Sequence, residues 1–270
     1  MPPEPERAGG AEAGRAIPGR PGPGSAIVAA ALVAAVALAW WWLASRGSGA
    51  GTEMASMRAG NVWTAGYLGA AVTMWALMMV AMMLPSAAPM ILLYERLLRR
   101  SVAGNPLPRT AVFALAYVTI WTLFSVVAAV AQATLISSGI VSEMALRIGN
   151  GRIAGALLLF AGIYQLSPLK RACLESCRSP LSFLMRLWRP GSAGAIRLGV
   201  AHGLYCLGCC WALMLLLFVG GVMSLAWIAG LAILVFLEKL MPASLRTSKL
   251  IAITLLVAGL LLLLGVPYPV

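Results

Sequence analysis

The chain has 270 residues, of which 61% are hydrophobic and 10% are charged, and its formal net charge is +12. A soluble domain is usually about 45–50% apolar and about 25% charged, so a water-soluble fold could not bury this much apolar surface. The basic residues stand in short segments between apolar runs, which argues against a nucleic-acid surface and is typical of membrane topology signals. We therefore expect an all-α, polytopic membrane helix bundle.

The predicted elements follow one another with short connections. Residues 1–25 are rich in proline, glycine and charges of both signs, and we expect a disordered cytosolic tail there. The apolar run at residues 26–44 ends in three tryptophans and predicts an uncleaved membrane anchor helix. Residues 65–266 then predict a six-helix membrane domain. Its six apolar runs lie approximately at residues 65–93, 111–136, 153–168, 198–220, 222–240 and 249–266.

The lysines and arginines indicate the orientation of about seven transmembrane helices. If every run crosses the bilayer, sixteen of the twenty basic residues fall on the side that carries the N-terminal tail, and four fall on the other side. Cytosolic connections are enriched in Lys and Arg, so this asymmetry predicts a cytosolic N-terminus. We expect a multi-pass protein of the cell inner membrane or plasma membrane, with the lipid bilayer as its first partner.

The fifth predicted helix carries most of the soft metal-binding donors. His202, Cys206, Cys209 and Cys210 are spaced at i, i+4, i+7 and i+8. At 3.6 residues per turn these side chains fall on one helix face, in the cytosolic half of the predicted span. Imidazole and thiolate groups bind soft metals such as Cu(I) and Zn. The alternative is packing, because free cysteine is also a small hydrophobic residue.

A second pair of thiols lies just after the fourth predicted helix. Cys173 and Cys177 stand one helical turn apart if the segment is helical. The neighbouring Lys170, Arg171 and Arg178 would favour the thiolate form, which is the form that binds metal. A permanent disulfide is not expected on the reducing cytosolic side. Two incidental loop cysteines remain the alternative interpretation.

Methionines line the second predicted helix. Met74, Met78 and Met82 are spaced by four residues and form one stripe, and the thioether sulfur is a soft donor suited to Cu(I). We take Met78 and Met82 as candidate ligands, with gap-filling packing as the alternative. Pro85 and Pro89 predict that this helix kinks or ends, as transporter helices do near ion sites.

Two further patterns suggest packing or surface roles. Glu95 and Glu238 each precede a basic residue near a predicted cytosolic helix end, and we interpret both as parts of surface charge pairs. Gly199 and Gly203 have the Gly-x3-Gly spacing that lets one membrane helix approach another closely.

Three sequence blocks resemble a known family. They are MMVAMMLPSA at residues 78–87, YQLSPLK at 164–170 and HGLYCLGCCW at 202–211, and the likeness extends over about residues 65–245. The chain thus resembles the bacterial integral membrane proteins called domain of unknown function 2182, described as predicted metal-binding proteins. The resemblance implies a membrane fold and directs attention to the metal-ligating residues. These are His202, Cys206, Cys209, Cys210, Cys173 and Cys177.

The leading functional hypothesis is a protein that binds a soft metal ion, copper favoured over zinc, for transport, delivery or homeostasis. A metal chaperone or another membrane protein would be its partner. One alternative is a structural or assembly factor of a membrane complex, and another is a membrane thiol–disulfide redox protein. The chain contains no aspartate, so a Ser-His-Asp triad is excluded, and no phosphate loop is present. These observations favour a binding function over an enzymatic one.

Overall fold

The computed structural model describes residues 23–47, 61–101, 104–142, 146–241 and 247–266. Every apolar run of the sequence is helical in this structure. The helices are α1 (Pro23–Gly47), α3 (Ala65–Ser101), α4 (Leu107–Ser137), α5 (Gly151–Gln165), α6 (Pro168–Arg178), α7 (Pro180–Leu187), α8 (Gly191–Leu215), α9 (Leu217–Gly220), α10 (Leu225–Leu240) and α11 (Thr247–Leu263). The expected disordered tail lies outside the described residues, except that α1 already begins at Pro23.

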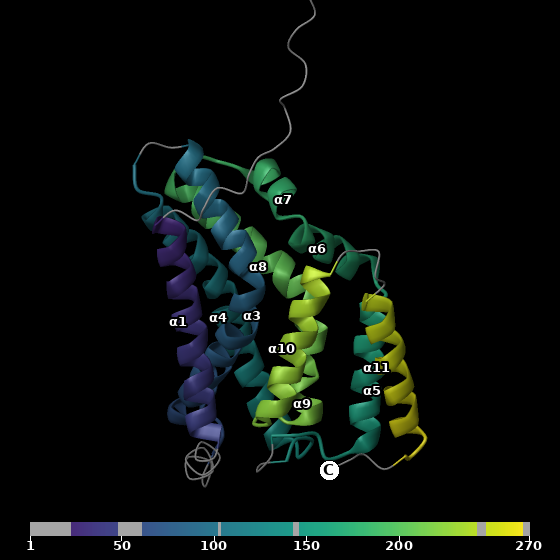
Figure 1. The fold of residues 1–270 in the computed structure, drawn as a ribbon. Helices are drawn as coiled ribbons and strands as arrows, with labels where there is room; N and C mark the ends of the chain where they lie inside the picture. The colour runs from purple at the N-terminus through teal and green to yellow at the C-terminus, as the bar shows by residue number, and fades with distance from the viewer. Residues whose placement is uncertain (1–22, 48–60, 102–103, 143–145, 242–246, 267–270) are drawn as a thin grey trace, which may run out of the picture.

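The long helices run side by side, and α6 and α7 lie across one end of the bundle (Figure 1). Helix α3 packs against α1, α4 and α10, and α8 packs against α4 and α6. Helices α5 and α11 pack on each other at one side of the bundle.

Four helices in the described part of the chain are long and apolar enough to cross a membrane, and they are α1, α3, α4 and the α8–α9 segment. Helices α5 and α6 together meet the same criterion, but they are bent by 63° at the break between them, so they give at most a fifth span. Helix α11 is apolar but shorter. The helical bundle is confirmed, whereas the count of seven spans and the orientation remain predictions.

The proline pair does not end the second predicted helix. Helix α3 continues through Pro85 and Pro89 as one helix of 37 residues. Local side chains supply hydrogen bonds around the prolines, since the Ser86 hydroxyl and the Tyr117 hydroxyl both donate to the Met83 carbonyl, at 2.9 and 3.1 Å. Membrane helices tolerate proline where neighbouring groups satisfy the backbone in this way.

The predicted Gly-x3-Gly contact is present between α8 and α4. A methyl group on Gly199 would lie 2.4 Å from the Phe113 carbonyl oxygen and 2.7 Å from the Ala116 side chain. On Gly203 it would lie 2.8 Å from Ile120. The two backbones approach so closely that only glycine fits, as expected for small residues at a membrane helix interface.

A buried ion pair joins α6 to α10. Lys170 Nζ donates to Glu238 Oε2 at 2.8 Å, and both side chains are at most 2% exposed. Ser248 of α11 and Gln165 of α5 donate to the other carboxylate oxygen, at 2.7 and 3.2 Å. Arg178 donates to the Glu238 carbonyl. The interpretation of Glu238 as a surface charge is therefore wrong, because this carboxylate is the shared acceptor of a buried network.

Glu95 is also buried rather than at the surface. Its carboxylate accepts hydrogen bonds from Ser25 of α1, at 2.6 Å, and from Arg99 one turn further along α3. The adjacent Gly24 leaves room for this carboxylate, since a methyl group there would lie 2.8 Å from Glu95 Oε1. The Glu95 carboxylate thus fixes the start of α1 against the end of α3.

We predict that Gly199→Ala destabilises the bundle by about 1–3 kcal/mol, because the added methyl group meets a backbone oxygen that cannot move aside. The measurement is the midpoint of thermal unfolding in detergent. Gly230→Ala in α10 is the matched control, since nothing lies within 4 Å of the position of its added methyl group. An equal loss of stability in both variants would contradict the close-packing argument.

We predict that Glu238→Gln lowers the free energy of unfolding by about 3–5 kcal/mol, because it leaves the Lys170 ammonium buried without its counter-charge. The double variant Glu238→Gln/Lys170→Met should recover much of this loss, since it removes both buried charges. Glu175→Gln, a change of the same type at an exposed position of α6, serves as the control. A double variant less stable than Glu238→Gln would count against the pairing.

Candidate metal centre

The four donors predicted on one face of α8 are all buried. His202, Cys206, Cys209 and Cys210 are each at most 3% exposed. They meet residues of α3, α4, α6, α7 and α10, so that five other helices complete their surroundings. All five cysteines of the chain are free thiols.

Cys206 lies at the centre of a polar contact between three helices. Its Sγ is 2.9 Å from Lys239 Nζ of α10 and 3.1 Å from the Tyr117 hydroxyl of α4. Lys239 also donates to the Ser86 hydroxyl of α3, at 2.9 Å. The ammonium group is buried, and neither of these two acceptors is a carboxylate. The positive charge of Lys239 therefore lies directly against a thiol sulfur.

Cys210 brings a second sulfur donor from α3 into the cluster. Its Sγ lies 3.9 Å from Met83 Sδ, and the thiol donates to the Cys206 carbonyl at 2.9 Å. The Met83 carbonyl is held by Tyr117 and Ser86, so this residue is fixed at both its backbone and its side chain. Two soft sulfur atoms from different helices thus meet in the core.

Cys209 connects the α8 thiols with α6. Its Sγ donates to the Cys206 carbonyl at 3.1 Å, and the thiol interacts with the thiols of Cys177, Cys206 and Cys210. Its own carbonyl accepts a hydrogen bond from Lys170 Nζ at 2.8 Å. We define the thiol cluster as Cys177, Cys206, Cys209 and Cys210 together with Met83.

The two thiols of α6 have different surroundings. Cys173 is buried beside Gly208, where a methyl group would lie 2.7 Å from the Cys173 sulfur. Cys177 is half-buried and interacts with Cys209. The nearby Lys170 and Arg178 bind Glu238, which gives both a structural role. The effect of Lys170, Arg171 and Arg178 on the α6 thiols stays a prediction.

His202 has no hydrogen-bond partner for either ring nitrogen in the described part of the chain. Its ring is enclosed by aromatic side chains, with centroids 5.2 Å from Tyr117, 5.8 Å from Phe183 and 6.2 Å from Phe113. A buried polar group without a partner costs about 1–3 kcal/mol and requires an explanation. A transient ligand for one of these nitrogens would provide one.

Within the described residues, no three side chains among His, Cys, Asp and Glu are arranged to hold a metal ion. The thiol cluster therefore does not form a closed tetrahedral site of the kind that structural zinc requires. The cluster offers instead one thioether sulfur and four thiol sulfurs, in which one sulfur lies next to another. Such a set can bind a soft ion with few ligands and exchange it between neighbouring sulfurs.

Among the described residues, the structure brings Met83 rather than Met78 or Met82 to within hydrogen-bonding distance of a thiol. Met78 and Met82 are equally buried in α3, and their role as ligands remains a prediction.

The sequence alone did not assign site roles to Tyr117 and Lys239. A lysine in an apolar run was a usable signal, because charges inside membranes are costly and tend to be functional.

Comparison with known proteins gives one family. A family model described as PpoB2, copper chaperone, matches residues 72–262. No curated protein and no solved structure matches the chain. The matched range includes every residue of the thiol cluster, together with His202, Tyr117 and Lys239.

We predict that one thiol of the folded protein reacts rapidly with a maleimide. Cys177 is the only half-buried cysteine, while the other four are at most 8% exposed. Mass spectrometry of the native protein in detergent should show one rapid adduct, and that adduct should be absent from Cys177→Ser. Denaturation should expose all five thiols. Rapid labelling of three or more thiols in the folded protein would refute the burial of the cluster.

Proposed function

The chain belongs to the PpoB2 copper chaperone family, and from this premise we propose that it holds Cu(I) in the thiol cluster and delivers it to another protein. Copper is the cargo rather than a resident cofactor. The family supports a copper-related role, and the chemistry of the donors supports this location within the fold.

The observation that carries the proposal is the contact between Cys210 and Met83. Two sulfur ligands at about 2.3 Å from one metal, with an angle between tetrahedral and trigonal, lie about 3.8–4.0 Å apart. The Cys210 and Met83 sulfurs are 3.9 Å apart. Only a small adjustment would therefore be needed for both to bind one ion, with Cys206 or Cys209 as a third ligand.

The donor types favour copper over zinc. A thioether is a weak, soft ligand suited to Cu(I), whereas structural zinc takes four ligands from Cys, His and carboxylates. The cluster supplies a methionine and no carboxylate. Neighbouring thiols also allow the ion to move from one sulfur to the next, which suits a protein that must release its cargo.

The charges around the site are balanced when copper is bound. Two thiolates and one Cu(I) carry a net charge of −1, and Lys239 contributes a positive charge 2.9 Å from Cys206. A charge buried in an apolar core is costly unless a partner compensates it. Lys239 thus compensates the loaded site, and its hydrogen bond to Ser86 holds the ammonium beside the cluster.

We propose further that the protein is a multi-pass integral membrane protein with seven spans and a cytosolic N-terminus. Four long apolar helices, the bent α5–α6 pair and the shorter α10 and α11 support this arrangement. The alternation of basic connections in the sequence supports the orientation. The thiol cluster would then lie toward the cytosolic face, where copper is kept as Cu(I).

A thiol–disulfide activity is the second candidate function. Its support is the interaction between the Cys177 and Cys209 thiols, which join two different helices. Oxidation of this pair would require an electron acceptor such as a quinone. Trapping of the thiol state in intact cells distinguishes the candidates, since a reversible disulfide favours redox chemistry and permanently reduced thiols favour copper binding.

We predict that the purified full chain binds about one equivalent of copper under anaerobic, reducing conditions. The double variant Met83→Leu/Cys210→Ser should lose at least about 90% of it, because each ligand contributes more than the 1.4 kcal/mol that changes affinity tenfold. Bound metal is measured by elemental mass spectrometry after incubation with Cu(I).

The matched control, Met90→Leu/Cys173→Ser, removes the same two types of sulfur from the same chain. Met90 lies two turns further along α3, and Cys173 packs against Gly208. Copper retained in the first double variant would rule out the cluster as the site. A parent protein without copper even after reconstitution would overturn the chaperone proposal and favour an assembly factor.

A further inference from the structure

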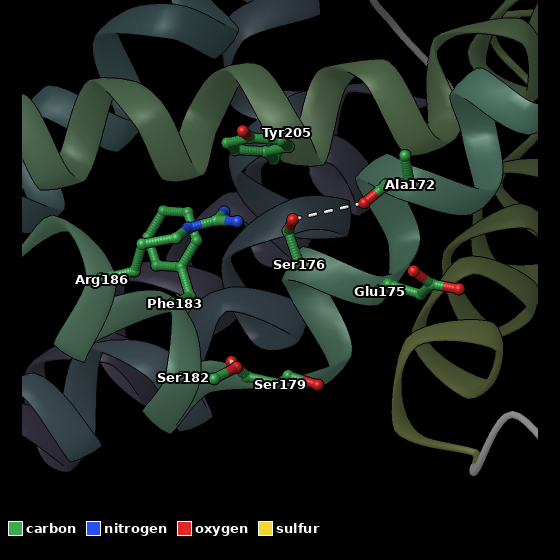
Figure 2. A pocket seen from close by; sticks show the side chains of 8 residues that line it. All are labelled: Ala172, Glu175, Ser176, Ser179, Ser182, Phe183, Arg186 and Tyr205. Atoms are coloured by element: carbon green, nitrogen blue, oxygen red, sulfur yellow. Dashed lines mark hydrogen bonds between the residues drawn. The ribbon is translucent and has the colours of Figure 1, made fainter.

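A pocket of about 400 Å³ opens between α6, α7 and α8, next to the thiol cluster. This volume lies within the range of about 300–1,000 Å³ that is usual for sites of small ligands. Figure 2 shows Phe183 and Arg186 from α7 on one side, Ser176 near the middle and Glu175 on the other side, with Tyr205 of α8 above them. Nothing in the copper site itself requires this pocket.

Two residues that line the pocket stand close in the chain to thiols of the cluster. Ser176 lines the pocket and directly precedes Cys177, while Tyr205 lines it one helical turn before Cys209. Cys177 is the half-buried member of the cluster, and its thiol interacts with that of Cys209. Cys177 does not itself line the pocket, so a ligand there would lie one residue along α6 from the half-buried thiol of the cluster.

The lining is suited to a small charged molecule. Arg186 and Glu175 provide one positive and one negative side chain on opposite sides, both exposed and neither in the buried Glu238 network. The Phe183 and Tyr205 rings, with centroids 5.7 Å apart, form an apolar surface between them. A guanidinium group binds carboxylates, and a carboxylate binds ammonium groups. Amino-acid and peptide thiols carry both of these groups together with a sulfur that binds Cu(I).

We propose that this pocket binds the Cu(I) complex of a small amino-acid or peptide thiol and that Cys177 takes the copper from it. Arg186 holds the carboxylate of the carrier and Glu175 its amino group, which places the carrier sulfur near Cys177. This inference rests on the proposed copper function. It adds the carrier class, the entry site and the first acceptor.

The transfer is a ligand exchange without electron transfer. The bond between copper and the carrier sulfur breaks while a bond between copper and Cys177 Sγ forms, and copper remains Cu(I). The proton that leaves the Cys177 thiol is taken up by the released carrier thiolate. Exchange from Cys177 to Cys209 then moves the ion toward Cys210 and Met83.

The basic residues around α6 and α7 favour a cytosolic position for the pocket, where small thiols are kept reduced.

The test measures the initial rate of copper loading of the full chain in detergent, with Cu(I)–glutathione as the donor. We expect Arg186→Gln to raise the donor concentration for half-maximal rate about tenfold, because a charge-assisted contact to the carboxylate is lost. Arg189→Gln is the matched control, since Arg189 is exposed nearby and does not line the pocket. With Cu(I) carried by 2-mercaptoethanol, which lacks both charged groups, Arg186→Gln and the parent should load equally.

Cys177→Ser provides the second measurement. It should slow loading from glutathione at least about tenfold, because the first acceptor of the ion is lost. Unchanged kinetics in both Arg186→Gln and Cys177→Ser, with normal copper content, would overturn the pocket assignment and leave the chaperone proposal intact. A parent chain that takes up no copper from either donor would instead overturn the proposed function.

Discussion

The buried carboxylate of Glu238 is the interaction on which the surroundings of the thiol cluster depend. It binds Lys170, and Lys170 in turn binds the carbonyl of Cys209, so one ammonium group connects α6, α8 and α10. Ser248 and Gln165 extend the same network to α11 and α5. Because burying an ion pair costs free energy unless its remaining hydrogen bonds are satisfied, the five helices are held in one relative arrangement. The position of α6 against α8, and hence that of Cys177 against Cys209, follows from it.

The second constraint is steric, and it determines which sulfurs can meet. Gly199 and Gly203 allow α8 to approach α4, and Gly208 leaves room for the Cys173 sulfur of α6. With α8 drawn close to both neighbours, Cys206 reaches Tyr117 and Cys210 reaches Met83. The packing thus works together with the ion pair to bring donors from three helices into one cluster.

Under the proposed function, the position of the cluster serves both the protection and the release of copper. Cys206, Cys209 and Cys210 are excluded from solvent, while Cys177 is half-buried and directly follows Ser176, which lines the pocket between α6, α7 and α8. Sulfurs that adjoin in pairs, rather than around one closed centre, bind an ion less permanently than a four-ligand site would. His202, enclosed by aromatic rings without a hydrogen-bond partner in the described structure, lies one turn from Cys206.

The sequence by itself determined the helical class, the helical conformation of the apolar runs, the burial of one α8 face and the close contact at Gly199, because these depend on hydrophobicity and spacing along the chain. It did not determine that α3 continues through Pro85, that Glu238 is buried or that Met83 is the methionine beside Cys210. Those outcomes depend on which atoms of distant segments approach one another. Helical spacing gives the face on which a side chain lies, but only the rotation and separation of packed helices decide which partner it meets.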